Sequence, residues 1–514
     1  MDTKKLRQKI LDLAIRGKLV PQDPNDEPAS VLLERIREEK KQMVKEGKLK
    51  AKDIKNDTII FKGEDNLHYE KFQDGTVKCI EDEIPFDIPD TWAWCRIRDI
   101  CNMSAGKSKS ADKISENPFE NSYPCFGGNG IRGYVDEYNN DGTYSIVGRQ
   151  GALCGNVNIA SGKFYATEHA VVTYLYSMID FKWSHYCLEG LNLNRFATGA
   201  AQPGLSVANV LNVLLPLPPF NEQCNIGQVV DKALTITDNL GTEKDNLLEI
   251  ITKTKSKILD LAIRGKLVPQ NETDEPAYGL LERIRSEKES LIKQGKLKRD
   301  KKESIIYKGD DNSYYEKLDD GSTINIDEDL PFDIPETWCW SRLSSLCRKE
   351  IKRGKAPKYI ESSGTLVFAQ KCNLKKGGID YTLAQYLDES TLSKYDASEF
   401  IRCGDTVINS TGTGTLGRVG FIDSLSEHPI VPDSHVTTIR AIDEIDQLYI
   451  FILLKSLQPI LEKSGEGSTN QKELKPNTLQ DIFVPIPPIE EQKRICKAVQ
   501  TSYGLIKDIE DSIN

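Results

Sequence analysis

Apolar residues recur at alternating spacings of three and four between about residues 222 and 264. This spacing is typical of a long helix that buries one stripe of its surface against a second helix. Two prolines precede the segment at 218–219, and Gly265 and Pro269 follow it, so the pattern predicts one continuous helix with a defined start and end. Eight of the eleven stripe positions are apolar, and the full set is Ile226, Val230, Ala233, Thr237, Leu240, Lys244, Leu247, Ile251, Thr254, Ile258 and Leu261.

The two ends of the chain repeat the two halves of this pattern. Ile495 and Val499, near the C-terminus, take the positions of Ile226 and Val230. The N-terminal segment repeats the end of the pattern in the same way. We therefore expect the chain ends to supply a second, split copy of the helix that packs antiparallel on the central one.

The fourteen residues at 9–22, KILDLAIRGKLVPQ, stand again without change at 257–270. Each copy is followed by a charged amphipathic pattern, at 28–50 and 276–298, which predicts a helix. A hairpin-like stretch with an Asp-Gly turn comes next. A repeated, exposed arm suits contact with a partner protein, and a merely solvated helix is the alternative.

Between the repeats the two halves of the chain diverge in sequence and in length, and similarity resumes with PLPPFNEQ at 216–223 and PIPPIEEQ at 485–492. Repeated parts beside freely diverging parts predict one surface presented twice and two segments with different tasks. Drift after a recent duplication is the alternative. The expected organisation is a split conserved helix at 1–22 and 489–514, repeated arms at 23–84 and 271–330, a central helix at 220–270, and variable domains at 85–219 and 331–488.

Composition narrows the class of protein only moderately. Apolar residues make up 38% and charged residues 28% of the 514, which is ordinary for a soluble protein. No apolar run approaches the roughly 20 residues that span a bilayer, and the N-terminus does not resemble a secretory signal, so we expect a cytoplasmic protein without membrane contact. The twelve cysteines form no C-x-x-C pair and do not cluster with the five histidines, so no metal site is expected.

The net charge of −10 does not by itself suggest a nucleic-acid partner, but its distribution is more informative. The variable segments are neutral overall, and each contains a basic stretch. The stretch at 342–358 holds seven basic residues and one acidic residue, and the stretch at 96–113 holds five and two. Clustered cations in glycine-containing loops suit contacts with phosphates, and a solvated basic loop is the alternative.

Catalytic motifs are incomplete in this chain. GTGTLG at 412–417 fits a dinucleotide-binding pattern, but a strand-like sequence follows where that pattern needs a helix. LPPF at 217–220 and IPPI at 486–489 lack the Asn or Asp that opens the corresponding motif of amino-methyltransferases, and no phosphate-binding GxxxxGK[ST] loop occurs. We therefore expect a non-catalytic protein.

The two variable segments, the long helices, the PLPPFNEQ and PIPPIEEQ signatures and the KILDLAIRGKLVPQ blocks together resemble the specificity subunit of type I restriction-modification systems. The resemblance covers essentially the whole chain. It implies an α+β fold in which two globular mixed α/β target-recognition domains are joined by a pair of long antiparallel coiled-coil helices, in a pseudo-two-fold, circular arrangement. The repeated arms go beyond a minimal version of the family pattern.

The resemblance also implies partners. Each recognition domain would read one half of a split, asymmetric sequence in double-stranded DNA, and the repeats would dock two methyltransferase subunits, with restriction subunits joining the complex. No cofactor is expected on this chain, because S-adenosylmethionine would belong to the methyltransferase subunits and ATP and magnesium to the restriction subunits. The residues expected to dock subunits lie on the helical stripe and are Ile226, Val230, Leu240, Leu247, Ile251, Ile495 and Val499.

The residues expected to contact DNA are basic or amide side chains, with one threonine, in the loops of the variable segments. They are Lys107, Lys109, Arg132, Arg149, Asn156 and Gln202 in the first segment, and Lys352, Arg353, Lys355, Lys358, Lys371, Asn409, Thr411, Arg418 and Gln471 in the second. Two other functions stay open from the residues alone. One is a bivalent protein scaffold that binds no DNA, and the other is an enzyme that uses the GTGTLG loop.

Overall fold

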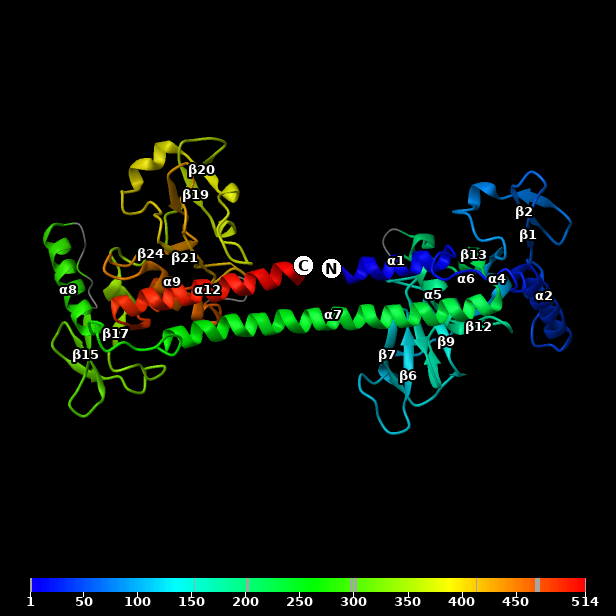
Figure 1. Ribbon diagram of the computed structural model, residues 1–514, viewed down its shortest axis with the longest axis horizontal. Coiled ribbons are helices and arrows are strands. Elements are labelled where there is room, and N and C mark those ends of the chain that lie inside the picture. The colour runs from blue at the N-terminus through cyan, green and yellow to red at the C-terminus, as the bar shows by residue number, and fades with distance from the viewer. Residues whose placement is uncertain are drawn as a thin grey trace. The chain divides into compact units, whose positions relative to one another are not determined.

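A computed structural model describes residues 2–151, 153–199, 203–295, 299, 303–412, 414–466 and 472–513 (Figure 1). Its contacts divide the chain into two compact units, residues 1–245 and 246–514. The boundary between them falls inside the long helix α7 (Phe220–Ile263). Each unit therefore contains one variable segment, one arm and one part of α7, and each is described by itself.

Helix α7 confirms the expectation of one continuous helix, with 44 residues. It ends because Gly265 adopts a left-handed backbone conformation with a φ of 65° and the N–H of Lys266 turns back to the carbonyl of Leu261 at 2.9 Å. This is a common C-terminal cap, in which glycine is favoured because it has no Cβ to clash.

In unit 1, helix α1 (Thr3–Ile15) packs antiparallel on the first part of α7. The direction follows from two contacts: Gln22 donates to Glu222 at 3.3 Å, and Arg7 pairs with Asp238 at 3.5 Å. Residue numbers thus fall along one helix as they rise along the other. Ile10 and Ala14 are buried in the same core as Ile226, Val230 and Leu234.

In unit 2, helix α12 (Ile489–Ile513) packs antiparallel on the last part of α7 in the same way. Gln270 donates to Glu491 at 2.6 Å, and Lys255 pairs with Glu510 at 2.8 Å. The expectation that each chain end packs antiparallel on the central helix is therefore confirmed within each unit.

The predicted stripe is not buried along its whole length. Leu240 exposes 43% and Leu247 37% of its surface within their units. In unit 1 the contact with α1 ends near Gly241, which faces Thr3 at the start of that helix. The middle of α7 therefore presents apolar side chains that the covering helix of its own unit does not reach.

The arm of unit 1 is a helix followed by a small sheet. The expected helix and Asp-Gly turn are present, and the sheet has three strands where the sequence suggested a hairpin. The elements are α2 (Ala29–Lys45), α3 (Ala51–Ile54), the antiparallel sheet β1-β2-β3 (Ile59–Lys62, His68–Lys71, Val77–Cys79) and the short η1 (Glu81–Glu83). Unit 2 repeats this arrangement with α8 (Ala277–Lys293) and the sheet β14-β15-β16 (Ser304–Lys308, Tyr314–Leu318, Thr323–Asn325).

The variable segment of unit 1 begins and ends on two paired strands, β4 (Ala93–Arg96) and β13 (Leu214–Leu217). Between them lie two four-stranded sheets. Their strand orders are β10-β9-β12-β5 (Val157–Ala160, Tyr144–Gly148, Ala170–Leu175, Cys101–Ala105) and β7-β6-β11-β8 (Gly130–Val135, Tyr123–Gly127, Lys163–Ala166, Asn140–Asp141). The helical elements are α4 (Ile97–Ile100), η2 (Ala111–Lys113), α5 (Phe181–Gly190), η3 (Leu193–Phe196) and α6 (Val207–Leu211).

The variable segment of unit 2 begins and ends in the same way, on β17 (Cys339–Arg342) and β25 (Phe483–Ile486). Its sheets have the strand orders β18-β20-β19-β23 (Tyr359–Ile360, Gln385–Leu387, Leu366–Phe368, Ile430–Pro432) and β22-β21-β24 (Val419–Phe421, Thr406–Asn409, Val436–Ile439). The helical elements are η4 (Leu343–Leu346), η5 (Gln370–Cys372), η6 (Tyr381–Leu383), η7 (Glu389–Lys394), α9 (Gln447–Ser456), α10 (Gln458–Leu461) and α11 (Pro476–Gln480).

The two variable segments share one framework although their sequences diverge. In unit 1, β9 lies between β10 and β12, both antiparallel to it, and β11 runs parallel to β6. In unit 2, β21 lies between β22 and β24, both antiparallel to it, and β23 runs parallel to β19. Divergence in sequence has therefore left the central strand pairings in place.

Candidate nucleic-acid interface

Several loops of unit 1 meet at the end of strand β9. The loop 149–156 follows this strand, and its Arg149 donates from the backbone to the carbonyl of His169 at 2.9 Å. The N–H of Leu205 donates to the carbonyl of Arg149 at 2.8 Å, and the side chain of Asn156 donates to that of Asn129 at 3.2 Å. These bonds gather the loops around 129, 149–156, 169 and 205 into one surface.

Gly155 closes the loop 149–156. Its N–H donates to the carbonyl of Gly148 at 2.7 Å, and its φ is 87°. A Cβ added here would overlap the backbone of Asn194, so the close approach requires glycine as well as the left-handed conformation. The loop conformation therefore depends on glycine at position 155, both for its φ and for the close backbone contact.

Unit 2 repeats the same bonds around strand β21. Ser410 donates from its backbone to the carbonyl of His435 at 2.8 Å, and Leu474 donates to the carbonyl of Ser410 at 2.8 Å. The loop closes when Gly417 donates to the carbonyl of Asn409 at 2.8 Å. The shared backbone bonds make Ser410 the equivalent of Arg149, and the next residue, Thr411, the equivalent of Gln150.

The glycine-lysine loops lie beside these clusters in both units. Gly106 donates to the carbonyl of Ala170 at 3.1 Å, and Gly354 donates to that of Val436 at 2.9 Å. A Cβ at either glycine would overlap backbone oxygens, those of Ala166 and Pro432 respectively. The two loops are therefore held in equivalent places, next to the histidine-bearing segments that contact Arg149 and Ser410.

Comparisons with known proteins identify the family. The family model described as "Type I restriction modification DNA specificity domain" matches residues 89–249 and 335–514, about two thirds of the chain. The chain belongs to this family.

Named specificity subunits are also similar in sequence. The EcoprrI specificity subunit of Escherichia coli is 42% identical over 32% of this chain, but the match covers only 41% of that relative. The EcoEI specificity subunit of the same organism is 24% identical over 99% of this chain and 90% of its own length. The prediction that the chain is a member of the type I specificity-subunit family is thereby confirmed.

A solved structure supports the fold. A chain from a study of the assembly and conformational transition of the type I restriction-modification system matches 84% of this chain and 94% of its own length, with a TM-score of 0.51 and 15% identity. The predicted α+β fold with two mixed domains and long helices is thereby confirmed.

Within this type I specificity fold, four of the residues predicted to contact DNA carry cations whose side chains make neither an ion pair nor a hydrogen bond among the described residues. Lys107, Arg132 and Lys371 are exposed, and Arg149 is half-buried. Asn156 is also exposed and is positioned by Asn129. These side chains are available to phosphates or bases, and Arg149 and Asn156 lie in the loop cluster itself.

Most other predicted cations are paired with carboxylates of their own unit. Glu137 holds Lys109 at 2.7 Å and raises the pKa of that lysine through their hydrogen bond. In unit 2 the partners are Glu399 for Lys355 at 2.6 Å and for Lys352 at 4.0 Å, Glu473 for Arg353 at 3.1 Å, and Asp388 for Lys358 at 2.6 Å. The basic stretch of unit 2 is thus largely neutralised, so a phosphate would compete with these carboxylates.

Two predicted residues use their side chains within the loop of unit 2. Asn409 is 0% exposed, and its amide donates to the carbonyl of Gln370 at 3.2 Å. Arg418 donates to the carbonyls of Asn373 at 2.7 Å and Gly414 at 3.1 Å. The expectation of DNA contact fails for Asn409 because its side chain is buried, and the guanidinium of Arg418 is used within the loop.

Thr411 lies inside the loop cluster of unit 2. Its hydroxyl lies 2.8 Å from Nδ1 of His435 and accepts from the side chain of Gln370 at 2.7 Å. The remaining two predicted residues, Gln202 and Gln471, lie outside the described residues.

Sequence reasoning missed His169 and His435, which occupy equivalent places in the two clusters. Each histidine directly precedes a buried strand, β12 or β24, in the segments TEHAVVT and DSHVTTI. A search of both halves of the chain for a polar residue that directly precedes a strand rich in β-branched residues could have found them. Gln150, and Gln370 at the start of η5, were not among the predicted residues either.

The structure also bears on cofactors and membranes. The residues after the glycine loop 412–417 form strand β22, where a dinucleotide site would need a helix. No group of His, Cys, Asp and Glu among the described residues could hold a metal ion. None of the described helices is long and apolar enough to cross a membrane.

Proposed function

We propose that this type I specificity subunit binds double-stranded DNA and that each variable domain contacts one half of a bipartite sequence. The observation that carries the proposal is the shared loop network with different side chains. The same backbone position holds Arg149 in unit 1 and Ser410 in unit 2, and the next holds Gln150 or Thr411. One scaffold that presents different hydrogen-bonding groups suits the reading of two different base sequences.

The neighbouring cations support the same proposal. Lys107, in the glycine-lysine loop, and Lys371, next to Gln370, are exposed and have no ion pair among the described residues. Contacts of lysine with phosphates position a protein on the duplex without reading its sequence. We therefore assign these two residues to the DNA backbone and Arg149, Gln150 and Thr411 to the bases. Ser410 is left out because it is 0% exposed and its hydroxyl bonds that of Thr437 at 2.7 Å.

The duplicated surfaces support two identical protein partners, which we propose are methyltransferase subunits. On the outer face of the arm sheet, Ile59 and Phe61 are exposed in unit 1, and Ile305 and Tyr307 take the same strand positions in unit 2. Exposed apolar side chains at repeated positions are typical of an interaction surface used twice. In this proposal S-adenosylmethionine belongs to the methyltransferases, ATP and magnesium to restriction subunits, and no cofactor to this chain.

The exposed stripe of α7 is a second part of the proposed docking surface. Of the seven stripe residues expected to dock subunits, Leu240 and Leu247 are exposed, whereas Ile226, Val230, Ile251, Ile495 and Val499 are buried within their own units. A buried side chain has no surface left for a partner, so direct contact would fall to the two exposed leucines.

The decisive experiment changes one loop and sequences the methylated bases of a host genome that carries the complex. The double variant Arg149→Ser, Gln150→Thr places the side chains of unit 2 on the scaffold of unit 1. We expect the recognised bases to change in one half of the site only. Lys232→Gln, an exposed substitution on α7, is the matched control and should leave both halves unchanged.

Two results would contradict the proposal. If the double variant left both half-sites unchanged, positions 149 and 150 would not read bases. If the complex with its methyltransferase bound DNA weakly and with no dependence on salt, a scaffold without DNA contact would be the better explanation, because phosphate contacts make binding strongly salt-dependent.

A further inference from the structure

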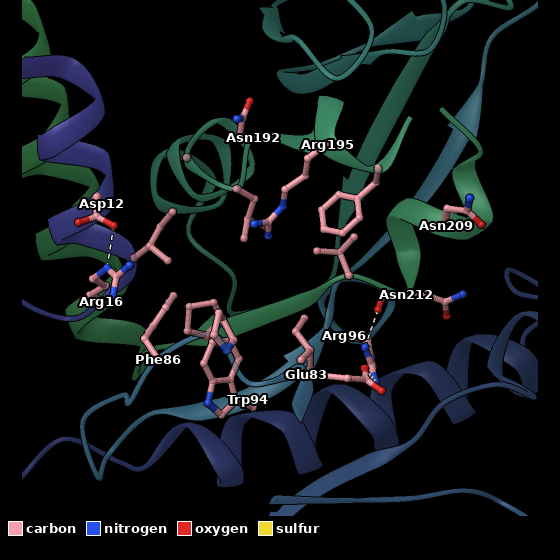
Figure 2. Close-up of a pocket in the computed structure, with 18 residues that line it drawn as sticks. Asp12, Arg16, Glu83, Phe86, Trp94, Arg96, Asn192, Arg195, Asn209 and Asn212 are labelled. Atoms are coloured by element: carbon pink, nitrogen blue, oxygen red, sulfur yellow. Dashed lines mark hydrogen bonds and ion pairs between the residues drawn. The ribbon is translucent and has the colours of Figure 1, made fainter. Parts of the chain in front are cut away.

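Unit 1 contains an open cavity of about 850 Å³ that the proposed DNA contacts do not use (Figure 2). Arg16, the residue that caps the C-terminus of helix α1, contributes to its wall, strand β4 contributes Trp94 and Arg96, and η3 contributes Arg195. Its volume lies in the range of roughly 300–1,000 Å³ that is usual for ligand pockets. Residues from both the repeated and the variable parts of the unit line the cavity.

One wall of the cavity is a stack of side chains from the repeated parts. Arg16 pairs with Asp12 at 2.7 Å and lies over the ring of Phe86, 4.6 Å from its centre. The ring of Phe86 in turn lies 5.3 Å from that of Trp94. A guanidinium over an aromatic face is a favourable arrangement that fixes both groups.

Unit 2 has the same stack. Arg264 pairs with Asp260 at 2.5 Å and lies 4.3 Å from the centre of the Phe332 ring, which lies 5.3 Å from the ring of Trp340. The repeated blocks therefore build the same wall twice, and any difference between the units must come from the variable segments.

One such difference is a residue on the last strand of the variable segment. Leu214 of β13 pairs in register with Arg96, and Phe483 of β25 pairs in register with Arg342. The ring of Phe483 lies 3.7 Å from the guanidinium carbon of Arg342 and 6.3 Å from the ring of Trp340. In unit 2 a phenyl ring of the chain itself thus lies against this wall, whereas unit 1 has only a leucine there.

The rim of the cavity in unit 1 is polar. Figure 2 shows Asn192, Asn209 and Asn212 around it, and all three are exposed. Their side chains make no hydrogen bond among the described residues, and an amide group can both donate to and accept from a peptide backbone. The equivalents of Asn209 and Asn212 in unit 2 are Thr478 and Asp481, so this rim is not repeated.

The charge of the cavity favours an anionic occupant. Arg16 and Arg96 already pair with Asp12 and Glu83, at 2.7 and 2.9 Å. Arg195 contacts the ring of Phe196 and has no carboxylate partner among the described residues. One guanidinium is therefore left for a carboxylate of a ligand, with which arginine forms strong, paired hydrogen bonds.

We propose that this cavity binds a peptide segment of a partner protein that carries an aromatic side chain next to a carboxylate. The aromatic ring takes the place that Phe483 has in unit 2, beside Trp94 and Arg96, and the carboxylate pairs with Arg195. The asparagine rim bonds the peptide backbone. Because the corresponding place in unit 2 is already filled, one such segment binds per chain. The proposal does not depend on DNA binding.

The test uses the full chain and two probes, the capped dipeptides N-acetyl-Phe-Glu-amide and N-acetyl-Ala-Glu-amide, in calorimetric titrations. We expect the phenylalanine peptide to bind at one site and the alanine peptide to bind at least tenfold more weakly. Leu214→Phe should fill the cavity and weaken the phenylalanine peptide at least tenfold, whereas Phe483→Leu should leave a single site, because unit 2 lacks the asparagine rim. Arg195→Gln should weaken both peptides by a similar factor.

Three results would overturn the proposal: equal binding of the two peptides, unchanged binding to Leu214→Phe, or tighter binding of free 3-phenylpropionate than of the phenylalanine peptide. The last would assign the cavity to a small aromatic acid instead of a protein segment. Leu214→Phe must retain the wild-type DNA affinity and melting temperature. If Leu214→Phe unfolds, Arg195→Gln decides, because Arg195 is exposed and its substitution does not disturb the core. Unchanged affinity of that variant for both peptides would also overturn the proposal.

Discussion

The indole N–H of Trp92 donates to the buried carboxylate of Glu222 at 2.9 Å, across 130 residues of sequence. Trp92 comes from the repeated segment that opens the variable domain, and Glu222 from the first turn of α7. Unit 2 repeats the bond between Trp338 and Glu491 at 3.0 Å. In each unit, therefore, a hydrogen bond between repeated residues connects the start of the variable domain to the start of a long helix.

Trp92→Phe should destabilise unit 1, because the carboxylate of Glu222 keeps only the 3.3 Å bond from Gln22. We expect a loss of about 1.5–3 kcal/mol in the free energy of unfolding, the usual contribution of a hydrogen bond to a charged group. Thermal unfolding followed by tryptophan fluorescence and circular dichroism measures the change. Trp338→Phe is the matched variant in unit 2 and should show a loss of similar size. A loss below about 0.5 kcal/mol in both would show that the bond is not a significant source of stability.

Lys107 and Lys109 lie two residues apart, but only Lys107 is exposed without an ion pair among the described residues. If phosphates bind here, Lys107→Gln should weaken DNA binding for all sequences alike and lower the slope of log affinity against log salt by about one. Lys109→Gln should have the smaller effect, since Glu137 already neutralises that lysine. Fluorescence anisotropy at several salt concentrations measures both slopes. The same reduction in both variants would mean that the ion pair with Glu137 does not persist on DNA.

The neighbouring carboxyl group of Glu444, together with burial, raises the pKa of Glu287 from its ordinary 4.5 to about 7. The folded state thus keeps a proton that the unfolded state releases near pH 4.5. The stabilisation is full below about pH 4.5 and is lost as the pH rises toward 7. Glu444→Gln should remove this dependence, so that its stability relative to wild type increases from pH 5 to pH 8.

Urea unfolding at several pH values measures this difference. Glu282→Gln, an exposed position on the same helix α8, is the control and should shift stability equally at all pH values. Parallel stability curves for wild type and Glu444→Gln would show that Glu444 does not raise the pKa of Glu287.

Gly106→Ala should disturb the glycine-lysine loop, because a Cβ there overlaps the carbonyl of Ala166 and the backbone must move. We expect a lower melting temperature and weaker DNA binding. Gly504→Ala is the control and should raise the melting temperature. Gly504 lies within helix α12, and no atom lies within 4 Å of a Cβ added there. Alanine in place of glycine stabilises a helix by about 0.5–1 kcal/mol. Differential scanning calorimetry distinguishes the two. A Gly106→Ala variant as stable as wild type would show that the loop adapts without cost.

The long helix could be predicted from sequence because its signals are local. The apolar spacing, the prolines before α7 and Gly265 after it all act within a few turns of the backbone. The exposure of Leu240 and Leu247 could not be predicted, because it depends on how far α1 and α12 extend along their partner. The third strand of each arm sheet was missed for a related reason: β3 and β16 have only three residues each.

The common framework of the variable domains was hidden for a different physical reason. Its defining bonds, such as Gly155 to Gly148 and Gly417 to Asn409, join backbone groups and place few demands on side chains. Only glycines mark them, and glycine is frequent in any loop. The candidate contacts were limited in the same way: sequence identifies Asn409 and Arg418 as polar, but only the fold shows that their hydrogen-bonding groups are used internally.

The pairing of β4 with β13, and of β17 with β25, brings the entry and exit of each variable segment side by side. These segments differ in length, yet each leaves and rejoins its frame through two adjacent strands in register. A gene that acquired a foreign segment between these points would therefore encode a chain whose frame is undisturbed. Such an exchange would give the protein a new recognition domain in one step, while the arms and helices stay as they are.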